Sequence, residues 1–217
     1  MSEIAAQKGH PKGLYILFAT EMWERFNYYG MRAILLYFMT KALLFKIDFA
    51  SNLYGSYISL LYLTPLVGGY IADRYWGNKR SILVGGLVMA AGELILFICA
   101  STYDTASELS NILFFSGLGF MIAGNGFFKP NISSLVGQLY PKGDLRIDTA
   151  YTIFYMGINI GATLGPILCG TFGNTGNPAD FKWAFLIAGI GMIVSVIIQK
   201  LFHDKYDLEN TDKILKK

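Results

Sequence analysis

Residues 14–44 read LYILFATEMWERFNYYGMRAILLYFMTKALL, a stretch long enough to cross a lipid bilayer, which takes about 20 predominantly apolar residues in a helix. Five similar apolar runs follow along the chain, in residues 49–71, 81–100, 112–139, 149–171 and 181–201. The polar connections between them are short and leave no room for a soluble domain. We therefore predict an all-α membrane protein, a bundle of six transmembrane helices.

The composition of the whole chain agrees with a membrane location. Of its 217 residues, 53% are hydrophobic and 15% are charged, whereas about a quarter of the residues of a soluble domain are charged. The formal net charge of +3 does not indicate nucleic-acid binding. Cys99 and Cys169 lie in apolar runs, without the spacing of a metal site or a disulfide framework. We expect no metal, no cofactor and no enzymatic activity, because the spans contain no nucleophile–base set.

The distribution of basic residues predicts the orientation of the bundle. Lysine and arginine favour the cytoplasmic side of membrane proteins. With the N-terminus inside, the cytoplasmic side receives Lys8, Lys12, Arg74, Lys79, Arg80, Lys142, Arg146, Lys200, Lys205, Lys213, Lys216 and Lys217. The outer side receives Lys41, Lys46 and Lys182. Both termini are then cytoplasmic.

This topology divides the chain into three parts. We predict a cytoplasmic N-terminus in residues 1–12, the six-helix bundle in residues 13–202, and a cytoplasmic linker or tail in residues 203–217. No cleavable signal peptide is expected, because the first dozen residues are polar and the first apolar run is too long for a signal core. The predicted location is the cell inner (plasma) membrane, with a multi-pass topology.

The first span carries charges that a hydrocarbon environment disfavours by about 2.5–3.5 kcal/mol each near the bilayer centre. At 100° per residue, six polar side chains fall within an arc of about 140° on one face of the helix. They are Glu21, Glu24, Arg25, Tyr28, Tyr29 and Arg32. The first span is therefore predicted to have one polar wall, which faces the interior of the bundle, and one apolar wall.

The polar wall suggests a route for coupling a proton to a ligand. Glu21 and Arg25 stand four residues apart in the order that favours a helical ion pair, and Glu24 also reaches the guanidinium. If an anionic ligand draws Arg25 away, a glutamate loses its counter-ion and takes up a proton more readily. We therefore predict that Glu21, Glu24 and Arg25 form a proton-coupling site.

Polar groups in other spans extend this prediction. Lys129 is a lone cation deep in the fourth span, and we expect it to face the same cavity as Arg25 and Arg32. Asn159 in the fifth span could join two helices or contact a polar ligand, and we favour the ligand. Tyr62 in the second span could be a wall residue or a packing aromatic. Together these groups suit a small zwitterionic substrate that bears a carboxylate.

Two further features of the spans are interpreted as structural. Gly157, Gly161 and Gly165 repeat every four residues in the fifth span and are expected to let a neighbouring helix approach closely. Glu93 in the third span has no obvious partner in the sequence. It is either protonated and structural or paired with a group that the sequence does not identify, and we favour the first interpretation.

Four stretches carry a resemblance to a known family. They are EMWERFNYYG (residues 21–30), GGYIADRYWGNKR (68–80), FKPNISSLVGQ (128–138) and FYMGINIGA (154–162). The first has the form E-x-x-E-R-F-x-Y-Y-G, which resembles the helix 1 signature of the proton-dependent oligopeptide transporter (POT/PTR2) family of the major facilitator superfamily. The similarity covers nearly all of residues 13–201. It implies proton-coupled symport of di- and tripeptides by alternating access across the cytoplasmic membrane.

The resemblance also implies roles for individual residues. It assigns proton coupling to Glu21, Glu24 and Arg25, and the pocket for the peptide carboxylate to Arg25, Arg32 and Lys129. Peptide contacts would come from Tyr28, Tyr29, Tyr62 and Asn159. Gating would involve Asp73, Arg74, Lys79, Arg80 and Lys129. The implied partners are di- and tripeptides, protons, the lipid bilayer and a second six-helix half, with no nucleic acid.

One departure from the family is large, and it keeps two alternatives open. Family members have two six-helix halves, whereas this sequence matches the N-terminal half only, so it should hold half of a binding site. The stretch Gly161-x-x-x-Gly165-Pro166 also resembles a motif of proton-driven drug antiporters of the same superfamily. The second alternative is a non-transporting six-helix assembly module, although a scaffold has no need for the buried charges.

Overall fold

The computed structural model describes residues 9–103 and 107–202. Within these ranges the chain forms long α-helices and no strand, which confirms the predicted all-α class. The helices are α1 (Lys12–Lys41), α2 (Ile47–Ile71), α3 (Asn78–Thr102), α4 (Ser107–Gln138), α5 (Ile147–Gly173) and α6 (Phe181–Phe202). Two short helical segments, η1 (Ala72–Trp76) and η2 (Pro178–Asp180), lie before α3 and α6.

The six predicted spans correspond to the six long helices, with shifts at their ends. The first span was predicted to run to Leu44, but α1 ends at Lys41. Leu44 has a φ of 56°, a left-handed conformation that turns the chain toward α2 and cannot continue a helix. The fourth helix begins at Ser107, whereas the predicted span begins at residue 112. The prediction began later because the first turn of α4 is more polar than its interior.

Four helices combine sufficient length with the apolar composition of a membrane span: α3, α4, α5 and α6. Helices α1 and α2 have 30 and 25 residues, which is also long enough to cross a bilayer. Both are more polar, because α1 carries the charged wall and α2 carries several tyrosines and serines. Six membrane crossings, both cytoplasmic termini and the three-part division of the chain therefore stay predictions.

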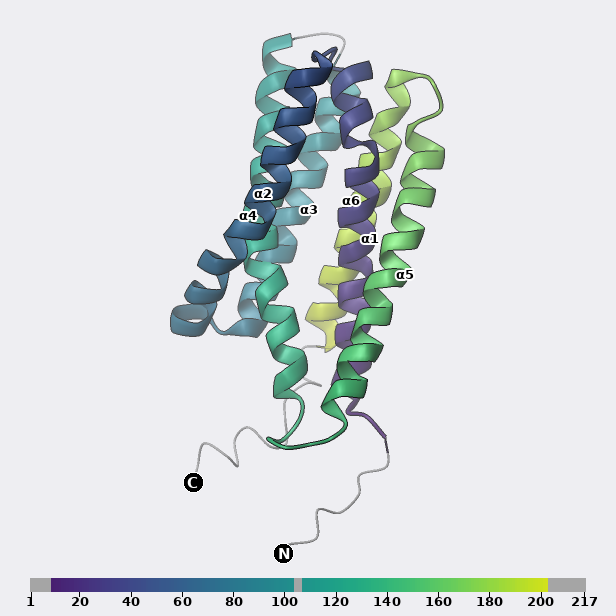
Figure 1. Ribbon diagram of the computed structural model, residues 1–217. Coiled ribbons are helices and arrows are strands. Elements are labelled where there is room, and N and C mark those ends of the chain that lie inside the picture. The colour runs from purple at the N-terminus through teal and green to yellow at the C-terminus, as the bar shows by residue number, and fades with distance from the viewer. Residues whose placement is uncertain (1–8, 104–106, 203–217) are drawn as a thin grey trace, which may run out of the picture.

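The helices are arranged in two groups that α6 joins. Figure 1 shows α2, α3 and α4 in one group and α1, α5 and α6 in the other. Helix α6 packs against both α1 and α3, while α1 makes few contacts with α2 and α4. The polar wall of α1 borders this sparsely packed region, so the arrangement places the charged residues between the two groups.

Glycines in α5 allow α1 and α5 to pack backbone to backbone. A Cβ atom on Gly161 would clash with the carbonyl oxygen of Met22, and one on Gly165 would clash with that of Phe26. A Cβ atom on Gly157 would lie 2.9 Å from the carbonyl oxygen of Phe18. The predicted packing role of the three glycines is confirmed, and it holds α1 against α5 along most of the polar wall.

One end of the bundle holds a polar cluster between the start of α1 and the connection from α4 to α5. His10 Nδ1 lies 2.8 Å from the Tyr140 hydroxyl, and Arg146 donates to the carbonyl oxygen of Gly9 at 2.6 Å. Arg146 also donates to Asp144 at 2.6 Å and holds the pKa of that carboxyl down at about 2. In Figure 1, α1 begins and α6 ends at this same end. Residues 1–8 and 203–217, most of the two predicted terminal segments, lie outside the described residues.

Candidate functional site

Four charged side chains of α1 and α4 form a chain of alternating sign. Lys129 Nζ lies 2.7 Å from Glu21 Oε1, and Arg25 Nε lies 3.2 Å from the same oxygen. Arg25 also donates two hydrogen bonds to the carboxylate of Glu24. Nε donates to Oε2, and Nη2 donates to Oε1 at 2.7 Å. The predicted ion pairs within α1 are therefore present. We call Lys129, Glu21, Arg25 and Glu24 the charge cluster.

The charge cluster is buried at one end and accessible at the other. Glu21 and Glu24 are fully buried and Arg25 is 6% exposed. The side chain of Lys129 is 32% exposed, so Lys129 is the accessible end of the charge cluster. Two positive and two negative charges leave it neutral as a whole, which is the condition under which ionised groups persist in a low-dielectric interior.

Lys129 joins two helices that otherwise barely meet at this level. It stands in α4 immediately before Pro130, and its bond to Glu21 crosses the sparse contact between α4 and α1. Lys129 and Arg25 share the partner Glu21, while a cavity common to Lys129, Arg25 and Arg32 stays a prediction. In this arrangement an anionic ligand that binds Lys129 competes with Glu21 for it.

A second group of the polar wall surrounds Arg32. Arg32 Nε donates to the hydroxyl of Tyr54 in α2 at 2.6 Å. The guanidiniums of Arg25 and Arg32 lie 4.9 and 6.0 Å from the centre of the Tyr28 ring, on which both stack as cations. No carboxylate pairs with Arg32 among the residues that the structure describes. Arg32 is half-buried.

Tyr29 borders this group, whereas Tyr62 and Asn159 lie outside the network. Tyr29 packs edge to face on Tyr28, with ring centroids 4.9 Å apart. Tyr62 is 72% exposed on α2 and Asn159 is exposed on α5. The structure thus brings the charged residues and Tyr28 together. Among the described residues no hydrogen bond or ion pair joins Tyr62 or the Asn159 side chain to them, although the Tyr62 hydroxyl lies within electrostatic range of that of Tyr28.

Their neighbours nevertheless place Tyr62 and Asn159 at the depth of the charge cluster. The Asn125 side chain, one turn before Lys129, donates to the carbonyl oxygen of Leu61 at 3.0 Å. A Cβ atom on Gly161, two residues after Asn159, would lie 3.0 Å from the Arg25 Cβ atom. The exposed faces of α2 and α5 therefore stand on either side of the cluster.

Apart from Lys129, which belongs to the charge cluster, the residues predicted to act in gating lie away from it, where α2 leads into α3. Asp73 and Arg74 belong to η1 and are exposed, as is Arg80 near the start of α3. Arg74 reaches the Tyr70 hydroxyl at 3.5 Å, and Lys79 is half-buried. This position suits an electrostatic role at the end of the bundle.

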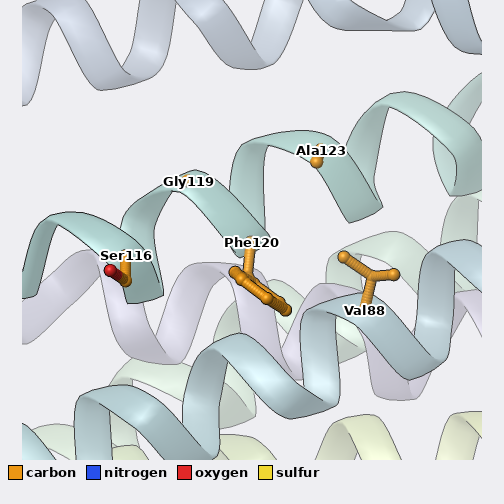
Figure 2. A pocket seen from close by; sticks show the side chains of 5 residues that line it. All are labelled: Val88, Ser116, Gly119, Phe120 and Ala123. Carbon is orange, nitrogen blue, oxygen red and sulfur yellow. The ribbon is translucent and has the colours of Figure 1, made fainter. Parts of the chain in front are cut away.

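A pocket elsewhere on the bundle is unrelated to the charge cluster. It has a volume of about 400 Å³ and lies between α3 and α4 (Figure 2). Its lining is Val88, Ser116, Gly119, Phe120 and Ala123. With one hydroxyl and no charge, this lining suits an apolar surrounding such as lipid and not a zwitterion.

Two residues of the polar interior, Tyr54 and Asn27, were missed by sequence reasoning. Tyr54 could have been found from its depth: α1 and α2 are antiparallel neighbours, and Arg32 and Tyr54 each lie about two turns from the connection between them. Asn27, whose side chain binds Glu93, had no comparable signal. In the described parts of the chain no group of three or more histidine, cysteine, aspartate or glutamate side chains could hold a metal ion.

Comparison with known proteins identifies the family. A family model described as the POT family matches residues 79–206 of this chain. The chain belongs to the POT family. Its relatives and structural neighbours are transporters and not enzymes, as the sequence predicted.

Two curated relatives are each 40% identical to this chain. The uncharacterized transporter YclF of Bacillus subtilis (strain 168) matches over 202 residues, 91% of this chain and 39% of the relative. The di-/tripeptide transporter of Lactococcus lactis subsp. lactis (strain IL1403) matches over 200 residues, 87% of this chain and 37% of the relative. The chain thus spans about two fifths of the length of these relatives.

Solved structures show the same likeness. A crystal structure of a mutant of peptide transporter POT in complex with alafosfalin superposes with a TM-score of 0.82 at 38% identity, covering 92% of this chain and 40% of that one. A POT family transporter in complex with 5-aminolevulinic acid gives the same TM-score and identity, covering 92% of this chain and 39% of the other. The six helices therefore have the arrangement of part of a POT transporter.

Proposed function

We propose that this chain is the N-terminal six-helix half of a proton-coupled symporter of di- and tripeptides. The observation that carries the proposal is the charge cluster, in which two buried carboxylates pair with the buried Arg25 and the half-buried Lys129 across α1 and α4. Relatives named as peptide transporters support the substrate class. The half would cross the plasma membrane six times with both termini cytoplasmic, and alternating access would require a second six-helix half.

Charge balance explains how this cluster couples a peptide to a proton. The cluster is neutral when it is empty of ligand, with Lys129 and Arg25 matched by Glu21 and Glu24. A peptide carboxylate that approaches Lys129 and Arg25 adds one negative charge, which a low-dielectric site disfavours. One proton on a glutamate restores neutrality. The peptide amine would need a further acid, which we expect from the second six-helix half.

The remaining polar groups would hold the peptide and control closure. Arg32, stacked on Tyr28 and bonded to Tyr54, would add a third cation for the carboxylate. Tyr29 would line the same wall, and Tyr62 and Asn159 would contact the peptide from the exposed faces of α2 and α5. Asp73, Arg74, Lys79 and Arg80 would stabilise the cytoplasmic end, while Lys129 would take part in both binding and closure.

Uptake into proteoliposomes tests the proposal. The intact transporter, under an inward proton gradient, should accumulate dialanine, and accumulation should stop when a protonophore collapses the gradient. A cationic dye serves as the alternative substrate. A proton-driven drug antiporter would export the dye in exchange for protons that move inward. Dye transport without dialanine uptake would contradict the peptide assignment.

Replacing Lys129 should weaken peptide binding. We expect Lys129→Ala to lower the affinity for a dipeptide by about tenfold to a hundredfold, because a hydrogen bond to a charged group contributes about 1.5–3 kcal/mol. Binding is measured over a pH series, with Lys129→Arg as the charge-conserving variant and Lys182→Ala, at the start of α6, as the control. Equal dipeptide affinity in Lys129→Ala and the wild-type protein would remove Lys129 from the site.

A further inference from the structure

A third buried carboxyl lies behind the polar wall, and it has a different environment from the charge cluster. Glu93 of α3 is fully buried and accepts a hydrogen bond of 2.7 Å from the side-chain amide of Asn27 in α1. The same amide nitrogen donates to the carbonyl oxygen of Ala188 in α6 at 3.1 Å. Asn27, itself fully buried, therefore joins α1 to both α3 and α6.

The groups that face Glu93 include no cation. Asn27 approaches from α1, the Tyr57 hydroxyl lies within electrostatic range from α2, and the Cys169 thiol does so from α5. The backbone of α6 closes the remaining side at Gly189, where a Cβ atom would lie 3.2 Å from that of Glu93. Among the described residues no lysine, arginine or histidine pairs with this carboxyl. An isolated carboxylate in such an interior would cost several kcal/mol.

The hydrogen bonding between Glu93 and Asn27 lacks one donor. Both N–H groups of the Asn27 amide are used, one on Glu93 and one on Ala188. Two buried acceptors, Asn27 Oδ1 and Glu93 Oε2, accept no hydrogen bond from the described residues, and the buried Tyr57 hydroxyl makes none either. A proton on the carboxyl group makes Glu93 a donor as well as an acceptor, so that an acid and an amide can bond to each other in both directions.

We propose that Glu93 is a neutral carboxylic acid that keeps its proton through the transport cycle and, with Asn27, forms an uncharged clamp that positions the polar wall of α1. Asn27 follows Glu24 by three residues, which is about 60° around the helix, so the clamp holds α1 at the edge of its polar wall, beside the charge cluster. Glu93 is thus a positioning residue, whereas Glu24 exchanges its proton. The link to transport rests on the proposed function.

Glutamine is a close mimic of the protonated acid and provides the first test. In Glu93→Gln the side-chain amide can donate to Asn27 Oδ1 and accept from its N–H groups, so every bond of the clamp is kept. We expect Glu93→Gln to retain both the unfolding temperature of the intact protein and the pH profile of dipeptide uptake. Glu93→Leu and Asn27→Leu, which remove one partner each, should lower the unfolding temperature and reduce uptake at least about tenfold, or 1.4 kcal/mol.

Infrared spectroscopy provides a test that does not depend on transport. At neutral pH, well above the ordinary glutamate pKa of about 4.3, the purified intact protein should show a carboxylic-acid carbonyl band that is absent from Glu93→Gln. The absence of such a band would mean that Glu93 is ionised and would overturn the proposal. It would also be overturned if Glu93→Gln failed to fold, or if it lost proton-driven accumulation while counterflow persisted. Failure of the wild-type protein to transport peptides would contradict the proposed function and leave the infrared and unfolding tests of the clamp intact.

Discussion

Glu24→Gln is expected to abolish proton-driven accumulation of dipeptides while peptide counterflow stays measurable. Glu24 has Arg25 as its ion-pair partner, whereas Glu21 is held by both Arg25 and Lys129. When a peptide carboxylate engages Arg25 and Lys129, Glu24 loses its counter-ion, whereas Glu21 can still share the three N–H donors of Lys129 with the peptide. Glu24 is therefore the better acceptor for the balancing proton, and glutamine at this position cannot release or take up that proton.

The measurement is uptake into proteoliposomes with and without an inward proton gradient. In the Glu24→Gln variant, the internal dipeptide concentration should rise no higher than the external one, whereas counterflow from preloaded vesicles should continue. The control is Glu108→Gln, because Glu108 is exposed in the first turn of α4 and belongs to no ion pair of the charge cluster. Normal accumulation by Glu24→Gln would refute the proton-coupling role of this residue.

The fold and the polar wall could be predicted because both follow from local periodicity. Apolar runs of sufficient length determine the helices, and a spacing of 3.6 residues per turn places Glu21, Glu24 and Arg25 on one face. Ion pairing within α1 needs no knowledge of the neighbouring helices. The close approach of α5 was also foreseeable, because glycines four residues apart make a groove on any helix.

Contacts between helices could be predicted less well, because they depend on how the helices are arranged. Lys129 was expected in the region of the polar wall, but its pairing with Glu21 spans 108 residues and follows from the positions of α1 and α4. The bond from Arg32 to Tyr54 depends likewise on α2. Glu93 was interpreted as structural without a partner, and its neighbour Asn27 stands within the signature stretch of α1 itself.

The large exposure of Tyr62 has a similar explanation. The sequence left its role open between a wall residue and a packing aromatic, and a packing aromatic would be buried. At 72% exposure Tyr62 is not buried against the described helices. Its exposure, like that of Asn159, is what a wall residue would show when only one side of a site is present, so both residues stay predicted peptide contacts.

Gly161→Ala is expected to have the second large effect, by forcing α5 away from α1. The added methyl group would clash with the carbonyl oxygen of Met22 and approach the backbone nitrogen of Phe26 to 2.8 Å. Both are backbone atoms of a helix and cannot turn aside as a flexible side chain would. Overpacking of this kind usually costs about 1–3 kcal/mol, and we expect the upper part of that range.

The same helix offers a matched control, since nothing lies within 4 Å of a Cβ atom built on Gly170. Gly170→Ala should leave the unfolding temperature of the purified intact protein unchanged or raise it slightly, because alanine favours helix more than glycine does. Gly161→Ala should lower it. Because the new methyl group would also lie 3.0 Å from the Arg25 Cβ atom, dipeptide affinity should fall together with stability. Equal unfolding temperatures for the two variants would show that α1 and α5 can separate at no cost, and that their close packing does not hold the charge cluster in place.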